Sequence, residues 1–315
     1  MACQAFQDIL GTSLHTCAIR NFALEVARTA DPVLLFGETG VGKELLARKI
    51  HFESDRREHP FLMIDCSLYY ERELMREVYG HSGIGATAKS RKGILEFASR
   101  GTCYFSHIEE LSPNLQESLL QFLRYRKFRR LGDGRETTSQ VRLVVSTDKN
   151  LEGFVEGGLF DRGLYCELSK NAQTIAPLRE RTEDIVAMAL LLAEAICVEK
   201  RLGQVQKFSE ECLEALKCFP WPHNFDDLSK ELQRILESGV DKISPENLSF
   251  EISSYWLGQR GDPQIRKVID ELDGLIREFK VLSRLDAEFG DILLNVASWE
   301  LTASKDDRNV MEHGH

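Results

Sequence analysis

The order of hydrophobic and polar positions divides the chain into a first part, where strands alternate with helices, and a second part that is helical. Apolar runs of strand length occur at four places, and apolar residues at helical spacing lie between them. The expected strands are residues 33–36, 60–65, 101–108 and 141–146, and the expected helices are residues 8–30, 45–50 and 115–128. This alternation predicts an α/β fold with a parallel sheet and helices on both of its faces.

From Pro177 onward the pattern is purely helical, with expected helices at residues 185–195, 210–218 and 227–236. The change in pattern marks a second, helical subdomain. We therefore predict three parts: an α/β subdomain over residues 1–176, a helical subdomain over 177–250, and a helical extension over 251–315 that ends in a disordered segment.

The extension carries a stripe of apolar residues at spacings of three and four: Ile265, Val268, Leu272, Leu275, Phe279 and Leu282. This spacing predicts an amphipathic helix, and residues 285–301 can form another. The stripe either packs on the helical subdomain or forms a partner-binding or oligomerising helix, and both interpretations stay open. The extension is acidic and shows no basic recognition helix, so direct, specific DNA binding is not expected.

A glycine-rich loop of the form G-x-x-x-x-G-K stands between the first strand and the following helix. Glycines let a loop turn its N–H groups inward, and a helix N-terminus adds positive potential for an anion. A lysine at this spacing reaches the terminal phosphates of a nucleotide. We predict nucleotide binding by Gly37, Glu38, Thr39, Gly40, Val41, Gly42, Lys43 and Glu44. The alternative is that the turn is kept for the fold alone.

Composition narrows the class of protein further. The 315 residues are 43% hydrophobic and 29% charged, with a formal net charge of -10, so the overall field repels nucleic acid. We find no apolar run near the ~18 residues that span a bilayer, and no secretory signal. The eight cysteines include no C-x-x-C pair, which is typical of reduced thiols in a cytoplasmic protein and predicts no structural zinc site.

Four stretches together resemble the AAA+ ATPase domain of sigma-54-dependent transcription activators, the bacterial enhancer-binding proteins. They are residues 37–45, residues 121–123 with 127–132, residues 177–181 with 183–185, and residues 221–224. The resemblance covers residues 8–250 and implies an AAA+ P-loop fold followed by a small helical lid. It also implies rings of subunits that hydrolyse ATP and remodel RNA polymerase holding sigma-54. Glu44, where the general phosphate-loop pattern has Ser or Thr, is usual in this family.

The positions that carry the family's chemistry are changed in this chain. By resemblance, Ser106 stands where the family has its magnesium-binding Asp, and His107 where it has the Glu that polarises water. Two family asparagines, one that senses the γ-phosphate and one that switches the catalytic Glu, fall at Asp148 and Asp65. Glu109 follows the strand end, so we do not expect it, or its neighbour Glu110, to replace the lost carboxylates.

The family's cations are also replaced. The first arginine finger falls at Asp161, with Arg162 one place late, and the second falls at Glu167. The lid arginine falls at Asp226. An arginine finger contributes roughly 10³ to 10⁵ to the rate of phosphoryl transfer, so its loss together with the metal ligand and the base predicts hydrolysis near background.

The loop that contacts polymerase in the family follows Gly80–His81 and lacks the family's Phe-Thr tip. We therefore expect a catalytically impaired AAA+ homologue that binds ATP or ADP without a firmly held Mg²⁺. It would act by contact with other AAA+ subunits or another bacterial regulatory or signalling protein, with no membrane association and no firm contact with sigma-54 polymerase. The alternatives are an active ATPase activator without its own DNA-binding domain, and a scaffold outside transcription.

Overall fold

The computed structural model describes residues 11–83, 89–202, 207–240 and 242–259. Contacts divide the chain into two units, Met1–Val205 with Pro220–Glu237, and Gln206–Phe219 with Ser238–His315. The predicted boundary at residue 176 stays a prediction. The apolar stripe that begins at Ile265 and the second predicted helix, at 285–301, lie outside the described residues.

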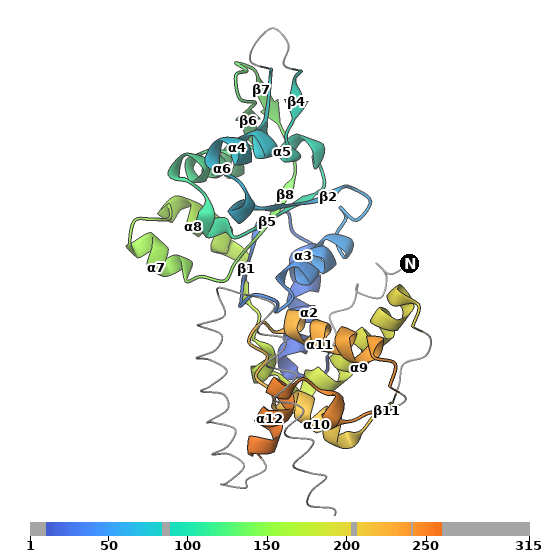
Figure 1. The fold of residues 1–315 in the computed structure, drawn as a ribbon. Helices are drawn as coiled ribbons and strands as arrows, with labels where there is room; N and C mark the ends of the chain where they lie inside the picture. Colours follow the sequence, from blue (N-terminus) through green and yellow to red (C-terminus); the bar gives the residue numbers. More distant parts are fainter. Residues whose placement is uncertain (1–10, 84–88, 203–206, 241, 260–315) are drawn as a thin grey trace, which may run out of the picture. The chain divides into compact units, whose positions relative to one another are not determined.

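The first unit contains a five-stranded parallel sheet with the strand order β2-β5-β8-β1-β9 (Figure 1). Its strands are β1 (Val33–Phe36), β2 (Phe61–Asp65), β5 (Thr102–Ser106), β8 (Arg142–Thr147) and β9 (Ala172–Thr174). The four predicted strands are confirmed. The sequence pattern missed β9, which is three residues long and lies at the edge of the sheet.

Helices cover both faces of this sheet, as predicted. Because side chains alternate along a strand, Val33 and Leu35 of β1 pack in one apolar cluster and Leu34 packs in another. The first cluster draws on α2 (Leu14–Ala27) and α3 (Lys43–Phe52), and the second on α4 (Glu71–Tyr79), α6 (Pro113–Tyr125) and α8 (Arg162–Leu168). The remaining helices of this unit are α5 (Ile94–Phe97), α7 (Leu151–Glu156), α9 (Thr182–Lys200) and α11 (Phe225–Glu237).

The helix predicted at residues 8–30 is too long, because α2 begins at Leu14 and ends at Ala27. Two other predicted elements also extend too far, and a left-handed residue explains each. The strand expected to reach residue 108 ends at Ser106, because His107 has a φ of 52°. The helix expected to reach residue 128 ends at Tyr125, because Arg126 has a φ of 57°. Neither backbone conformation continues a strand or a helix.

The chain after Arg126 forms a hairpin, and a second hairpin lies beside it (top of Figure 1). The strands of these hairpins are β6 (Lys127–Arg129) with β7 (Glu136–Thr138), and β3 (Gly80–His81) with β4 (Arg91–Lys92). The amide of Ser82 donates to the carbonyl of Leu131 at 3.0 Å, and the amide of Leu131 donates to the carbonyl of Gly80 at 2.9 Å. The loop expected to contact polymerase begins at this junction, but its residues 84–88 lie outside the described residues.

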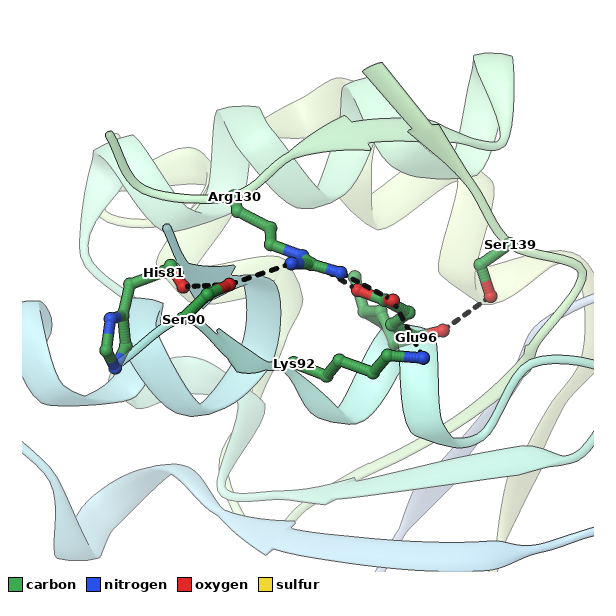
Figure 2. Close-up of polar contacts among 7 residues, drawn as sticks. His81, Ser90, Lys92, Glu96, Arg130 and Ser139 are labelled. Atoms are coloured by element: carbon green, nitrogen blue, oxygen red, sulfur yellow. Dashed lines mark hydrogen bonds and ion pairs between the residues drawn. The ribbon is translucent and has the colours of Figure 1, made fainter. Parts of the chain in front are cut away.

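Side chains reinforce the junction between the two hairpins (Figure 2). Arg130 donates to both carboxylate oxygens of Glu96, at 2.7 and 2.9 Å, and to the hydroxyl of Ser90 at 3.0 Å. Lys92 lies 3.3 Å from Glu96, so one carboxylate joins a cation from each hairpin. The two hairpins therefore form one connected element.

The second unit contains α10 (Glu210–Cys218), α12 (Phe250–Gln259) and the short parallel pair β10 (Lys207–Phe208) and β11 (Lys242–Ile243). The region after Pro177 is therefore not purely helical, contrary to the prediction. No helix in the described part of the chain is long and apolar enough to cross a membrane. The cysteines that the structure describes are free thiols, and four of them are buried: Cys66, Cys103, Cys197 and Cys212.

Candidate functional site

The glycine-rich loop lies where the sequence predicts it, between the end of β1 at Phe36 and the start of α3 at Lys43. Gly40 has a φ of 76°. A Cβ atom at this position would lie 2.1 Å from the carbonyl oxygen of His223, so the loop passes too close to that segment for any other residue. Gly42 is the left-handed residue that immediately precedes α3, and it directs the chain into the helix.

Lys43 is directed back into the loop that precedes it. Its Nζ donates to the carbonyl oxygens of Gly37 at 2.6 Å and Glu38 at 2.9 Å. Burial lowers the pKa of Lys43 below its ordinary value, and the carboxylates of Asp148, Glu109 and Asp226 oppose this change. Glu38 acts in the same direction, so the ammonium group lies in the field of four acidic side chains.

Further residues bind the loop through their side chains, and our sequence analysis did not assign them to the site. The side-chain amide of Asn224, which is fully buried, donates to the carbonyl of Thr39 at 3.0 Å and to Glu38 at 3.2 Å. Arg181 donates to the carbonyl of Val41 at 3.0 Å, and Arg179 forms an ion pair with Glu38. The sequence contained a signal that could have assigned them, because these residues fall in two of the stretches that resemble the family.

A cavity of about 680 Å³ opens beside the loop. One part of its wall is apolar and includes Ile19, Ile175, Met188, Leu192 and Phe225. Another part is polar and includes Lys43, Ser106, His107, Thr147 and Asp226. Binding sites of this size commonly combine an apolar wall with a few polar groups. The wall therefore suits a nucleotide, with the base against apolar side chains and the phosphates at the loop.

The carboxyl ends of β2 and β5 bring three of the altered positions together, because Asp65 and Ser106 are register partners. Nδ1 of His107 lies 3.0 Å from Oδ1 of Asp65. The same oxygen accepts hydrogen bonds from the amide and the hydroxyl of Ser67, at 2.9 and 2.7 Å. Burial acts to raise the pKa of Asp65, but the hydrogen bonds from Ser67 and His107 hold it below its ordinary value. One carboxylate oxygen of Asp65 is therefore already engaged by groups of the protein.

Glu109 follows the strand, as expected, but the sequence analysis did not predict that it is buried near the cavity. It lies in the single helical turn Ile108–Glu110 that follows His107, and only 8% of it is exposed. Its Oε2 has no hydrogen-bond partner among the described residues. Burial raises the pKa of Glu109 above its ordinary value, against a hydrogen bond from Thr147. A buried carboxyl thus lies beside the cavity wall, close enough to act on Lys43.

Two further acidic positions are also near the loop. Asp226 lies in the first turn of α11 and lines the cavity. Asp148 directly follows β8, and although burial acts to raise its pKa, Lys149 and Lys43 hold it below the ordinary value. The structure therefore brings Asp148 and Asp226 together at Lys43, as the resemblance implies.

The positions of the family's arginine fingers lie elsewhere. Arg162 begins α8 and is exposed, and Asp161 is the N-cap of the same helix, where its carboxylate accepts from the amide of Leu164 at 2.7 Å. Glu167 pairs with Lys170 at 2.5 Å. Among the described residues that line the cavity, none comes from α8.

Comparison with known proteins agrees with this geometry. The model of a family described as the sigma-54 interaction domain matches residues 9–173, more than half of the chain. The chain belongs to the sigma-54 interaction domain family. A relative of this domain, the Nif-specific regulatory protein of Azotobacter vinelandii, is 36% identical over 70% of this chain and 43% of its own length. The anaerobic nitric oxide reductase transcription regulator NorR of Vibrio vulnificus is 34% identical over 72% of this chain and 45% of its own.

The match with this chain thus spans less than half the length of these curated relatives. A solved structure of NtrX from Brucella abortus in complex with ADP is 26% identical, with a TM-score of 0.71, and the match covers 77% of this chain and 55% of that one. A structure of the same protein in complex with ATP has a TM-score of 0.71 at 24% identity, which shows the shared fold. The AAA+ P-loop fold predicted from the sequence is confirmed.

Proposed function

We propose that this protein is a regulatory AAA+ subunit of the sigma-54 activator class that binds ATP or ADP and acts by protein contact, with little or no hydrolysis. The class rests on its membership of the sigma-54 interaction domain family. The observation that carries nucleotide binding is the loop itself, with Lys43 at its end and a cavity of about 680 Å³ beside it. A solved relative in complex with ADP supports the same part of the proposal.

Impaired hydrolysis rests on the chemistry at the strand ends. Phosphoryl transfer needs a carboxylate-held metal, a group that orients the attacking water, and positive charge on the γ-phosphoryl group. Ser106 offers a neutral hydroxyl to a metal, and His107 is turned toward Asp65. These residues do not fit a firmly held Mg²⁺, so we assign no step to one.

The missing positive charge supports the same conclusion. Asp148 and Asp226 stand near Lys43, where the family has an amide and a cation. Arg162, the nearest replacement for a finger, is exposed on α8, from which it would have to reach the site of a neighbouring subunit. A subunit built in this way would hold nucleotide without turning it over, and would transmit its state through contacts with other AAA+ subunits or a bacterial regulatory protein in the cytoplasm.

The second candidate is an active ATPase activator of sigma-54-dependent transcription. Similarity to a Nif-specific regulatory protein and to the transcription regulator NorR favours this candidate. The intact loop and Lys43 are compatible with it as well.

Phosphate release from ATP by the purified protein separates the two candidates. We expect the same background rate for the wild type and for Lys43→Ala, which removes the cation of the loop. Steady turnover that Lys43→Ala abolishes would overturn the proposal in favour of the activator. Thermal shifts with ADP and ATP on the same two proteins test binding independently of turnover, and Lys43→Ala should lose any shift that the wild type shows.

The partner class is tested by purifying the tagged protein from its native cell and identifying the bound proteins by mass spectrometry. Recovery of another AAA+ protein or a regulatory protein supports the proposal. Recovery of sigma-54 polymerase alone supports the activator.

A further inference from the structure

The charges of four carboxyl groups act on the ammonium group of Lys43, those of Asp148, Glu109, Asp226 and Glu38. Glu38 is itself paired with Arg179, and Glu109 is a residue that the sequence alone did not place. Its side chain is 8% exposed and its Oε2 has no hydrogen-bond partner in the part of the chain that the structure describes. Asp226, in the first turn of α11, lines the same cavity as Lys43. Asp148 directly follows Thr147 at the end of β8, and Glu109 lies in the turn after His107; Thr147 and His107 both line that cavity. The acidic groups therefore approach the end of the loop from three separate elements.

The nearby cations are already engaged. Lys43 donates to the carbonyls of Gly37 and Glu38, Arg179 is paired with Glu38, and Arg181 donates to the carbonyl of Val41. A diphosphate needs only the loop amides and Lys43. A triphosphate places one further charged group beyond Lys43, toward the carboxylates, and like charges in a partly buried site repel strongly.

We propose that Glu109, together with Asp148 and Asp226, makes this pocket select a nucleoside diphosphate over the corresponding triphosphate. The inference rests on the proposed function, because it assumes that a nucleotide occupies the loop. It assigns to Glu109 a role in specificity: the carboxylate excludes the terminal phosphate and does not hold a metal.

Isothermal titration calorimetry of the full chain with ADP and with ATP tests this at about pH 8, far above the ordinary pKa of aspartate and glutamate. Each titration is done with Mg²⁺ and with EDTA. We expect ADP to bind about tenfold more tightly than ATP, or better. A tenfold ratio of dissociation constants corresponds to a difference of about 1.4 kcal/mol in binding free energy. Glu109→Gln keeps the shape and removes the charge, so it should tighten ATP binding and lower the ratio of the two dissociation constants several-fold. Glu110→Gln, one residue along and exposed, is the matched control and should leave the ratio unchanged.

Asp148→Asn gives the same test at a less buried position if Glu109→Gln does not fold, and it should also lower the ratio. Equal or tighter binding of ATP by the wild type would overturn the inference, as would a ratio that neither substitution changes. Weaker ATP binding by Glu109→Gln in the presence of Mg²⁺ would also overturn it, because Glu109 would then be a metal ligand. Binding of neither nucleotide would instead remove the proposed function, and this inference with it.

Discussion

His107 faces Asp65 across the ends of two neighbouring strands, with 3.0 Å between Nδ1 and Oδ1. The family has a glutamate and an asparagine at these two places, so both members of the pair have changed together. The imidazole is matched to a carboxylate, and the carboxylate is also held by Ser67. This pairing gives His107 a partner within the protein.

The pairing predicts that restoring the family's glutamate alone will be unfavourable. His107→Glu would place two carboxylates at ion-pair distance, and because both side chains are about a third exposed, we expect a loss of roughly 1 kcal/mol in the free energy of unfolding. Adding Asp65→Asn should recover most of that loss. Urea unfolding of the two single variants and the double variant checks this, and a double variant no more stable than His107→Glu would contradict it.

Gly40 is predicted to be irreplaceable for steric reasons. Gly40→Ala would add a Cβ atom 2.1 Å from the carbonyl oxygen of His223, at a φ of 76°. We expect a loss of at least about 2 kcal/mol in the free energy of unfolding, from overpacking and strain. Gly134→Ala is the control, because that Cβ would meet nothing within 4 Å. Similar unfolding curves for the two variants would show that the loop can move away from His223.

Asn224 is predicted to stabilise the loop through the hydrogen bonds of its side-chain amide. Its Oδ1 accepts from the amide of Leu178 at 2.8 Å and its Nδ2 donates to Thr39 and Glu38, so Asn224→Ala leaves several buried groups unpaired. We expect a loss of about 2 to 3 kcal/mol in the free energy of unfolding. The exposed neighbour His223 provides the control through His223→Ala. If thermal unfolding of both variants begins at the wild-type temperature, Asn224 does not support the loop.

Asp184 gives a prediction for pH. It is buried and accepts from the amides of Thr12 and Ser13, at 2.6 and 2.7 Å, and from the hydroxyls of Ser13 and Thr16, both at 2.6 Å. Burial acts to raise the pKa of Asp184, but these hydrogen bonds hold it below the ordinary value. A lowered pKa in the folded state stabilises the protein above the ordinary pKa of aspartate, and this contribution is lost as the pH falls through the folded value.

Asp184→Asn should therefore reduce the free energy of unfolding by about 2 kcal/mol at neutral pH. The difference from the wild type should shrink as the pH falls from about 5 toward about 3. Urea unfolding across this range measures it, with the exposed neighbour substitution Glu183→Gln as the control. A difference that stays constant with pH would mean that the charge of Asp184 does not matter.

The junction of the two hairpins is predicted to depend on Glu96. Glu96→Gln removes the charge that pairs with Arg130 and Lys92 (Figure 2), so the amides of Ser82 and Leu131 should exchange hydrogen faster, by up to about tenfold. Glu136→Gln removes a carboxylate that pairs within the β6–β7 hairpin and serves as the control. Unchanged exchange at Ser82 and Leu131 would show that the backbone bonds alone join the hairpins.

Sequence patterns predicted those parts of the molecule whose structure is determined by residues close together in the sequence. The strand, loop and helix around Lys43 follow one another directly, so their spacing was enough to place them. The helix at residues 210–218 was predicted at its observed bounds for the same reason. The ends of the strand before His107 and the helix before Arg126 were wrong, because a single left-handed residue interrupts a pattern that otherwise continues.

Contacts between distant segments could not be predicted in the same way. Glu109 follows the strand and was not expected to replace the lost carboxylates, but the sequence could not show that the turn after His107 buries its carboxyl where it acts on Lys43. Asn224 and Arg181 reach the loop from 140 or more positions along the chain. Their side chains gave no periodic signal, and only the fold shows what they touch.

The amide of Phe225, the first residue of α11, donates to the carbonyl of Gly40 at 3.0 Å, and α11 packs on α9. Loop and helix are thus linked by backbone atoms, which side-chain substitution cannot remove. An occupant that shifted the loop would act on the start of α11 through this bond, and on α9 through the packing of the two helices.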